Sequence, residues 1–449
     1  MSGPDGLDGG RRRVSFREAL GFWARLGLVN FGGPAGQIAL MHREVVDRRR
    51  WLGEEQFLRA LNFCMILPGP EAQQLAVYIG WLLHGTAGGI AAGVLFVVPS
   101  IFVLLVLSWL VAAHADVPAV AGLLYGVRPV VIAIVAEAVL RIGRRTLRHP
   151  ALYLFAAAAF IAIAFFAVPF PLIVAAAAAL GILLERALPE AVRARGAGTA
   201  DAEPPVAGAN RAVPGARSAP TGSSYPPAGR AVRIVLLFAA LWALPVGLLR
   251  LWRGGGDVLV KEALFFTRAA FITFGGAYAV LSYIAHVAVN VYGWLTADQM
   301  IQGLALAEST PGPLIMVTQY VGFIGAWNQA HGLSPLASGV LGALITTYVT
   351  FLFCFMFIFV GAPYVEALAG NRRLQAALVG VTSAVVGVIL NLATFFGAHV
   401  LLPAGRGLDV FALGLALVSL VAIVRFRLPI QYLVPAGALV GMAWSLLTR

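Results

Sequence analysis

Glycine and proline motifs interrupt apolar segments at two places in the N-terminal half of the sequence. The first is NFGGP at residues 30–34, and the second is PGPE at residues 68–71. Glycine and proline disfavour a continuous helix, so each motif should end one half-helix and start another. The start of a helix presents unpaired N–H groups and about half a positive charge, which favour an anion. We therefore predict an anion site at these breaks; the alternative is that they only kink helices and ease their packing.

The breaks recur in the C-terminal half of the sequence. Three motifs repeat at one ungapped offset of 243 residues: Phe31-Gly32-Gly33 as Phe274-Gly275-Gly276, Trp51-Leu52 as Trp294-Leu295, and Pro68-Gly69-Pro70 as Pro311-Gly312-Pro313. Arg25 falls on Arg268 in the same register. Ala277 stands where the first copy has Pro34, which leaves open whether the second FGG breaks its helix as sharply. The pattern predicts a duplicated unit with split helices, an architecture typical of transporters.

Arginines and amides near the breaks are candidate ligands for the anion. A guanidinium stays charged and its planar fork suits tetrahedral oxyanions; the alternative for Arg25 and Arg268 is snorkelling toward the membrane edge. The predicted substrate-binding residues are Arg25, Asn30, Phe31, Gly32, Gly33, Gln37, Pro68, Gly69, Pro70, Gln73, Arg128, Arg268, Gly275, Gly276, Thr310, Pro311 and Gly312.

Three carboxylates are candidates for carrying a coupling proton: Glu71, Glu137 and Glu308. Ionisable residues are costly inside a membrane and are usually functional there. Glu71 directly follows PGP, where capping of the new helix is the alternative role. Arg128 and Glu137 have no charged counterpart in the other half, so we expect an asymmetric site. A structural salt bridge is the alternative for Arg128.

Composition sets the class of protein. The 449 residues are 60% hydrophobic and 12% charged, about half the charged fraction of soluble domains. Several apolar runs suffice to cross a bilayer core of about 30 Å, and backbone groups in lipid must pair within helices. The net charge is +12, and the basic residues fall mostly between the apolar runs, as in cytoplasmic loops. We therefore expect a lipid bilayer and no nucleic acid as partner. The fold class is predicted to be an all-α polytopic membrane protein.

Changes in composition divide the chain into five parts. They are a cytoplasmic tail (1–16), a first repeat (17–187), a disordered cytoplasmic linker (188–231), a connecting transmembrane helix (232–252) and a second, inverted repeat (261–449). The arginines of residues 47–55 are absent from the matching residues 290–298, whereas Arg372 and Arg373 match the loop 112–118, which has no positive residue. Because positive loops stay cytoplasmic, this exchange predicts that the second repeat is upside down.

The motifs FGGP, PGPEAQQLAVYIG, YGVRP and the second FGG with STPGP together give a family resemblance. The chain resembles the chromate ion transporter family in its long, two-domain form. The resemblance implies a multi-pass protein of the inner (plasma) membrane that exports chromate from the cytoplasm and confers chromate resistance, with sulfate as a second substrate candidate. Alternating access at a central site, driven by proton movement or by the membrane potential, is the expected mechanism. Whether the protein forms a homodimer is left open.

Two other functions are alternatives to chromate export. The first is a carrier of sulfate or another oxyanion with the same fold. The second is a membrane enzyme acting on lipids, for which the sequence lacks DDxxD, HExxH and GxSxG motifs. We therefore expect a transporter and not an enzyme, with no metal site and no cofactor.

Overall fold

The chain folds into helices alone wherever its structure is described. The computed structural model describes residues 14–190, 228–365, 371–403, 405 and 407–448, and these contain no strand. Seven helices in this part of the chain are long and apolar enough to cross a membrane. The predicted class, an all-α polytopic membrane protein, is confirmed. The predicted tail (1–16) and linker (188–231) lie almost wholly outside the described residues.

The first half of the chain contains seven α-helices and one π-helical turn. Its elements are α1 (Phe16–Val29), α2 (Gly33–His42), the π-helical turn η1 (Arg43–Arg48), α3 (Glu54–Ile66), α4 (Glu71–His114), α5 (Pro118–Thr146), α6 (Pro150–Phe166) and α7 (Phe170–Ala187). Helix α4 is itself broken at His84 and Gly85, where the backbone leaves the helical region. α1 and α3 have 14 and 13 residues. At 1.5 Å per residue they reach about 20 Å, too short to cross the bilayer core.

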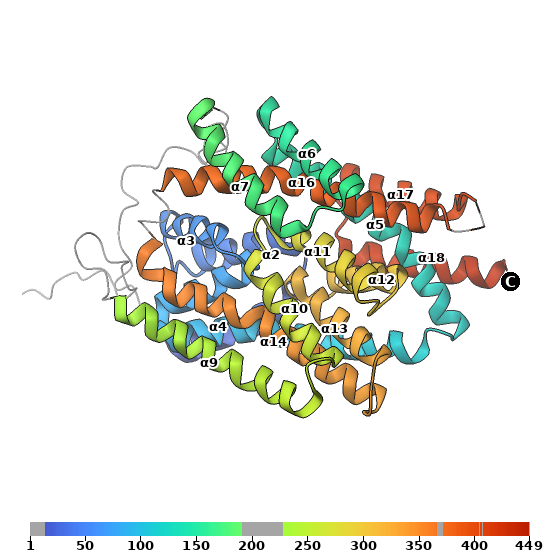
Figure 1. The fold of residues 1–449 in the computed structure, drawn as a ribbon, viewed down its shortest axis with the longest axis horizontal. Coiled ribbons are helices and arrows are strands. Elements are labelled where there is room, and N and C mark those ends of the chain that lie inside the picture. Colours follow the sequence, from blue (N-terminus) through green and yellow to red (C-terminus); the bar gives the residue numbers. More distant parts are fainter. Residues whose placement is uncertain (1–13, 191–227, 366–370, 404, 406, 449) are drawn as a thin grey trace, which may run out of the picture.

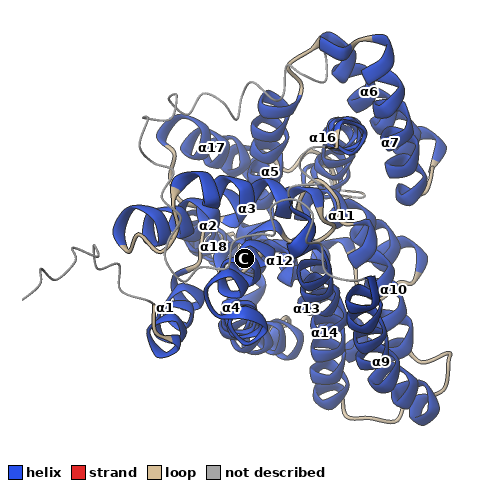
Figure 2. Ribbon diagram, turned by 90° about the vertical axis from the view of Figure 1, so that its left-hand side faces the viewer, coloured by secondary structure: helices blue, strands red, loops and turns tan. Residues whose placement is uncertain are grey.

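The second half repeats this order after the connecting helix α9 (Ala228–Arg253). Its elements are α10 (Val258–Ile272), α11 (Ala277–Ala285), the π-helical turn η3 (His286–Val291), α12 (Ala297–Ser309), the short turn η4 (Leu314–Met316), α13 (Val317–Asn328), α14 (Pro335–Gly361), the short turn η5 (Ala362–Tyr364), α16 (Arg372–Leu401), α17 (Val410–Phe426) and α18 (Ile430–Leu447). All four predicted breaks therefore separate helices. α4, α13 and α14 pack together at the centre of the molecule (Figure 2).

The two halves bind each other through their breaks. The amide of Gly312 donates to the carbonyl of Asn30 (2.9 Å), and the amide of Gly69 donates to the carbonyl of Thr273 (2.8 Å). Thr273 and Gly312 lie 243 residues after Asn30 and Gly69, so one contact is made twice with the halves exchanged. Such reciprocity is what a two-fold relation between equivalent units produces. The side chain of Gln37 reinforces one copy by donating to the carbonyl of Gly312 (2.6 Å).

The outer helices exchange partners in the same reciprocal way. α5 of the first half packs on α18 of the second, and α16 of the second half packs on α7 of the first (Figure 1). Both contacts run through glycines: a Cβ on Gly126 would lie 2.6 Å from the Cα of Gly441, and one on Gly380 would lie 2.9 Å from the Cα of Gly181. Small residues allow membrane helices this close approach. Each half is thus completed by the other.

Replacing Gly312 with alanine should destabilise the protein by at least about 2 kcal/mol, because strain and overpacking add. Its φ of +126° suits glycine, and an added Cβ would collide with the side chain of Ser100. Thermal unfolding of purified protein, followed by loss of the monodisperse peak, measures the effect. Gly397→Ala is the matched control, since no atom lies within 4 Å of the added methyl group. Equal melting temperatures for the two variants would contradict the importance of the crossing.

Candidate functional site

A cavity of about 1260 Å³ lies between the two halves and reaches three of the four breaks. Pro34 and Glu71 line it from the first half, and residues 275–278 line it from the second. The Glu71 carboxylate lies against the second FGG, since its Oε1 is 3.6 Å from where a Cβ would stand on Gly276. The cavity therefore joins the PGP break of one half to the FGG break of the other.

Five arginines line this cavity and give it a positive field. Arg141 and Arg145 come from the end of α5, Arg186 from the end of α7, and Arg372 and Arg373 from the start of α16. Two glutamates, Glu71 and Glu185, are the acidic residues of the lining. A cleft lined by one sign of charge concentrates ions of the opposite sign, and guanidinium groups suit oxyanions. In the sequence, Arg372 and Arg373 served only as markers of loop orientation and the other three were not singled out, so the cluster was missed.

The FGG break of the second half forms a helix start that faces the cavity. Gly275 and Gly276 have φ values of +79° and +96°, which glycine adopts without strain, and α11 begins at Ala277. The second FGG thus breaks its helix without the proline found in the first copy. The N–H groups of a first helical turn have no partner within the helix, and residues 276–278 of this turn line the cavity. This helix start can donate hydrogen bonds to an anion.

Two of the three predicted coupling carboxylates lie together beside this helix start. The hydroxyl of Tyr278, at the start of α11, donates to Oε1 of Glu308 on α12. Glu137 forms an ion pair with Arg141 on α5, with Oε1 and Nε 3.2 Å apart. Both carboxylates act electrostatically on the same tyrosine. Glu137 and Glu308 therefore have bonded partners, and Tyr278 and Arg141 link them to the cavity.

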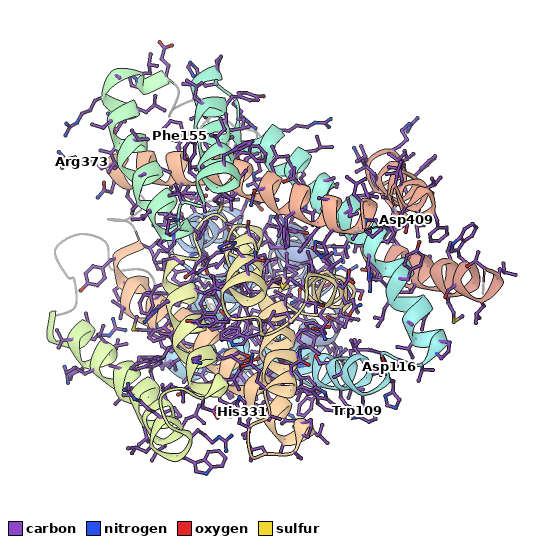
Figure 3. The ribbon with its side chains drawn as sticks, turned by 45° about the vertical axis from the view of Figure 1, so that its right-hand side comes forward. Trp109, Asp116, Phe155, His331, Arg373 and Asp409 are labelled. Carbon is purple, nitrogen blue, oxygen red and sulfur yellow. The ribbon has the colours of Figure 1, made fainter. Side chains whose placement is uncertain are left out.

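A second cavity, of about 1000 Å³, lies at the other end of the molecule. Figure 3 shows the separation, with Arg373 of the first cavity at one side and Asp409 of the second at the other. In the second cavity Arg128 pairs with Asp298 of α12 (3.0 Å), and the hydroxyl of Tyr125 donates to Asp409 of α17 (2.6 Å). This cavity is not lined by any of the four breaks. Arg128 thus makes the salt bridge left open by the sequence, away from the breaks.

Three predicted amide ligands are fully buried. Asn30, Gln37 and Gln73 each have 0% of their surface exposed. The side-chain amides of Asn30 and Gln73 have no hydrogen-bond partner in the described part of the chain, and neither has the side-chain oxygen of Gln37. Buried polar groups are nearly always paired, so unpaired donors beside a helix break point to a ligand. None of the three lines either cavity.

The other predicted ligands frame the breaks rather than face a cavity. The amides of Gly69 and Gly312 are used by the crossing between the halves. The carbonyl of Pro68 accepts from Gln74 (2.7 Å) and that of Pro311 accepts from Ser100. The remaining residues of this kind are Phe31, Gly32, Gly33, Pro70 and Thr310, which lie at helix ends within the breaks. Their backbone conformation sets where each half-helix begins.

Arg25 and Arg268 are the two predicted ligands on α1 and α10. Both side chains are exposed, and neither lines a cavity. The buried stripe of α1 follows Ala19, Phe22, Trp23 and Leu26, and Arg25 lies outside it. Spacing along the chain suggested proximity, whereas the face of the helix decides it. The exposed position favours the snorkelling alternative.

Comparison with known proteins agrees with this architecture. The family model for the chromate transporter matches residues 17–182 and 260–442. The chain is 31% identical to the chromate transport protein of Pseudomonas aeruginosa, over 90% of this chain and 87% of that protein. It is 26% identical to the chromate transport protein of Cupriavidus metallidurans (95% and 93% covered) and to the probable chromate transport protein of Synechococcus elongatus (96% of each).

No solved structure matches the chain. The two family matches are separated by residues 183–259, so the family unit occurs once in each half of the chain. The same division emerges from the offset of 243 residues and from the reciprocal bonds at the breaks. Multi-pass in the membrane and duplicated in sequence, this chain belongs to the chromate transporter family.

Proposed function

We propose that the protein exports chromate across the plasma membrane by alternating access and so confers chromate resistance. One observation carries the mechanism: equivalent residues of the two halves differ in exposure. Asn62 of α3 is exposed and lines the arginine-rich cavity, whereas Ala305, 243 residues later on α12, is 0% exposed. Two inverted units with one side open and the other closed are what alternating access requires. Exchange of the two arrangements would move the opening to the other face.

The open cavity faces the cytoplasm in this proposal. Its arginines lie at the ends of α5 and α7 and at the start of α16, and positive charge at helix ends marks the cytoplasmic side. α9 also begins at this end of the molecule (Figure 1), so in this proposal the linker that precedes it is cytoplasmic, and so is the N-terminus. A dianion that leaves an inside-negative cell gains about 2.3 kcal/mol per charge per 100 mV.

The oxyanion is held in two stages. The cavity arginines attract it, and the start of α11 then donates backbone hydrogen bonds to it. Glu71 occupies the first turn of α4, so its negative charge rather than that of the substrate interacts with the positive end of this helix. The unpaired amides of Asn30 and Gln73 complete the site when the halves close around the ion. These groups recognise a tetrahedral dianion, and the relatives' names favour chromate over sulfate.

Expression of the gene in a chromate-sensitive strain should raise the chromate concentration that permits growth. Everted membrane vesicles from that strain should accumulate labelled chromate, because their cytoplasmic face is outward. Inhibition by unlabelled sulfate, compared with inhibition by unlabelled chromate over the same concentrations, separates the two oxyanions. Half-inhibition at a lower concentration of sulfate than of chromate would make sulfate the better substrate, and uptake equal to that of empty-vector vesicles would overturn the proposed function.

The double variant Arg372→Gln, Arg373→Gln should lower the initial rate of chromate uptake into everted vesicles by roughly three- to tenfold at low salt. Two positive charges are lost from the cavity, and electrostatic attraction on this scale is screened by salt. The deficit should therefore shrink at high ionic strength. Arg17→Gln is the control, since Arg17 is exposed and lies outside the cavity. A deficit that is independent of salt would argue against an electrostatic role.

Alternating access predicts opposite labelling of the equivalent positions Asn62 and Ala305. In a protein with Cys64 and Cys354 replaced by alanine, a membrane-impermeant maleimide should label Asn62→Cys from the cytoplasmic face and leave Ala305→Cys unlabelled.

Adding Asp298→Asn removes the ion pair with Arg128 that joins α5 to α12 in the second cavity. It should raise the external labelling of Ala305→Cys several-fold and lower the labelling of Asn62→Cys. Labelling of both positions from the same face in all variants would refute the mechanism.

A further inference from the structure

Glu262 is a fully buried carboxyl group that the transport site does not use. It lies on α10 with 0% of its surface exposed, and neither carboxyl oxygen has a hydrogen-bond partner in the described part of the chain. Two glycines leave room for it: a Cβ on Gly325 of α13 would lie 2.6 Å from Oε1, and one on Gly342 of α14 would lie 3.0 Å from Oε2. The carboxyl group is thus enclosed where three helices meet.

The surroundings of Glu262 hold no compensating positive charge. α10 packs against α14, α13, α9 and α11. α11, α13 and α14 carry no Lys, Arg, Asp, Glu or His at all, and their titratable groups are tyrosines and the thiol of Cys354. The charged group that acts on Glu262 is Asp257, at the start of α10, and it is paired with Arg253 of α9 at 3.1 Å. The other charged groups of α9 are Arg230, Arg233 and Arg250. Lys261 is exposed on another face of α10.

This environment fits a proton and not a metal cation. A carboxylate buried without a donor or a countercharge is strongly disfavoured, and binding a proton removes its charge. A sodium or divalent ion would need several oxygen ligands. The carboxyl oxygens of Glu262 instead lie against Gly325 and Gly342, and the side chain of Trp294 lies beside Gly325. Glu262 differs in this from Glu137 and Glu308, which both have bonded partners.

The position of Glu262 in the fold also suits a coupling role. Its equivalent in the first half is Ala19, so the group belongs to one half only. Glu262 follows Asp257 by five residues, about 7.5 Å along the helix. It therefore lies near the N-terminal end of α10, which follows directly after the C-terminal end of α9. α9 runs away from the end of the molecule that holds the arginine-rich cavity (Figure 1). Glu262 therefore lies toward the face opposite the cavity opening.

We infer that Glu262 is a proton-binding site that couples oxyanion export to proton entry. The inference rests on the proposed function. In the state with the cavity open to the cytoplasm, the carboxyl group is neutral and enclosed between α10, α13 and α14. Movement of these helices exposes the carboxyl group to each face in turn. It takes up a proton from water on the external face and releases it to water on the cytoplasmic face. One proton enters as the oxyanion leaves.

The test uses the purified protein in liposomes with the membrane potential clamped at zero by potassium and valinomycin. An acid-inside gradient of one pH unit should drive labelled chromate into wild-type proteoliposomes, with accumulation up to about tenfold for one exchanged proton. Counterflow of labelled against unlabelled chromate needs no net proton movement. Glu262→Gln keeps the shape and fixes the neutral form. It should therefore abolish accumulation and retain counterflow at no less than half the wild-type rate.

Glu55→Gln is the matched control, because Glu55 is an exposed carboxylate on α3 that pairs only with Arg59 at the helix surface. It should retain both accumulation and counterflow. Absence of wild-type counterflow would refute the proposed function itself. Wild-type counterflow without gradient-driven accumulation, or accumulation retained in Glu262→Gln, would overturn the coupling role alone. Loss of both activities in a Glu262→Gln protein that elutes like the wild type would make Glu262 a structural residue and would also overturn it.

Discussion

Backbone groups freed at a helix break must find partners, because lipid offers none. The FGG and PGP motifs make four such breaks, and each half satisfies the other: Gly69 donates to Thr273 and Gly312 donates to Asn30. Neither half could satisfy these groups alone. The crossing also places PGP of one half beside FGG of the other, and so creates the surface from which the cavity is built. The fold and the site therefore depend on the same two hydrogen bonds.

The crossing is symmetric, but the ends of the molecule are not. At one end the arginine-rich cavity separates the halves. At the other, Arg128 and Asp298 hold α5 to α12, and Tyr125 and Asp409 hold α5 to α17. The residue equivalent to Asp298 in the first half is Glu55, which pairs with its own helix instead. Such a fixed centre with unequal ends suits a two-state carrier, since the ends can exchange roles while the central contacts persist.

Local chemistry made part of this structure predictable. Glycine and proline act on their own segment, so the four breaks and the offset of 243 residues follow from the sequence. Which break meets which is a tertiary property, and no local pattern encodes it. Arg25 and Arg268 do not line either cavity, because distance along the chain does not decide which face of a helix a residue occupies. Glu262 escaped notice because only the glycines of two other helices show that it is enclosed.

Neither Arg25 nor Arg268 lines a cavity, which has a consequence for transport. A carrier must bind its ion tightly enough to take it up and weakly enough to release it. In the described part of the chain, the fixed cations stand along the cavity, whereas the breaks offer glycine backbone, a helix start and neutral amides. Attraction is thus long-ranged at the entrance and modest at the centre, where a permanent guanidinium pair would hold a dianion too firmly. Neutral dipoles at the breaks allow the ion to be passed on when the halves move.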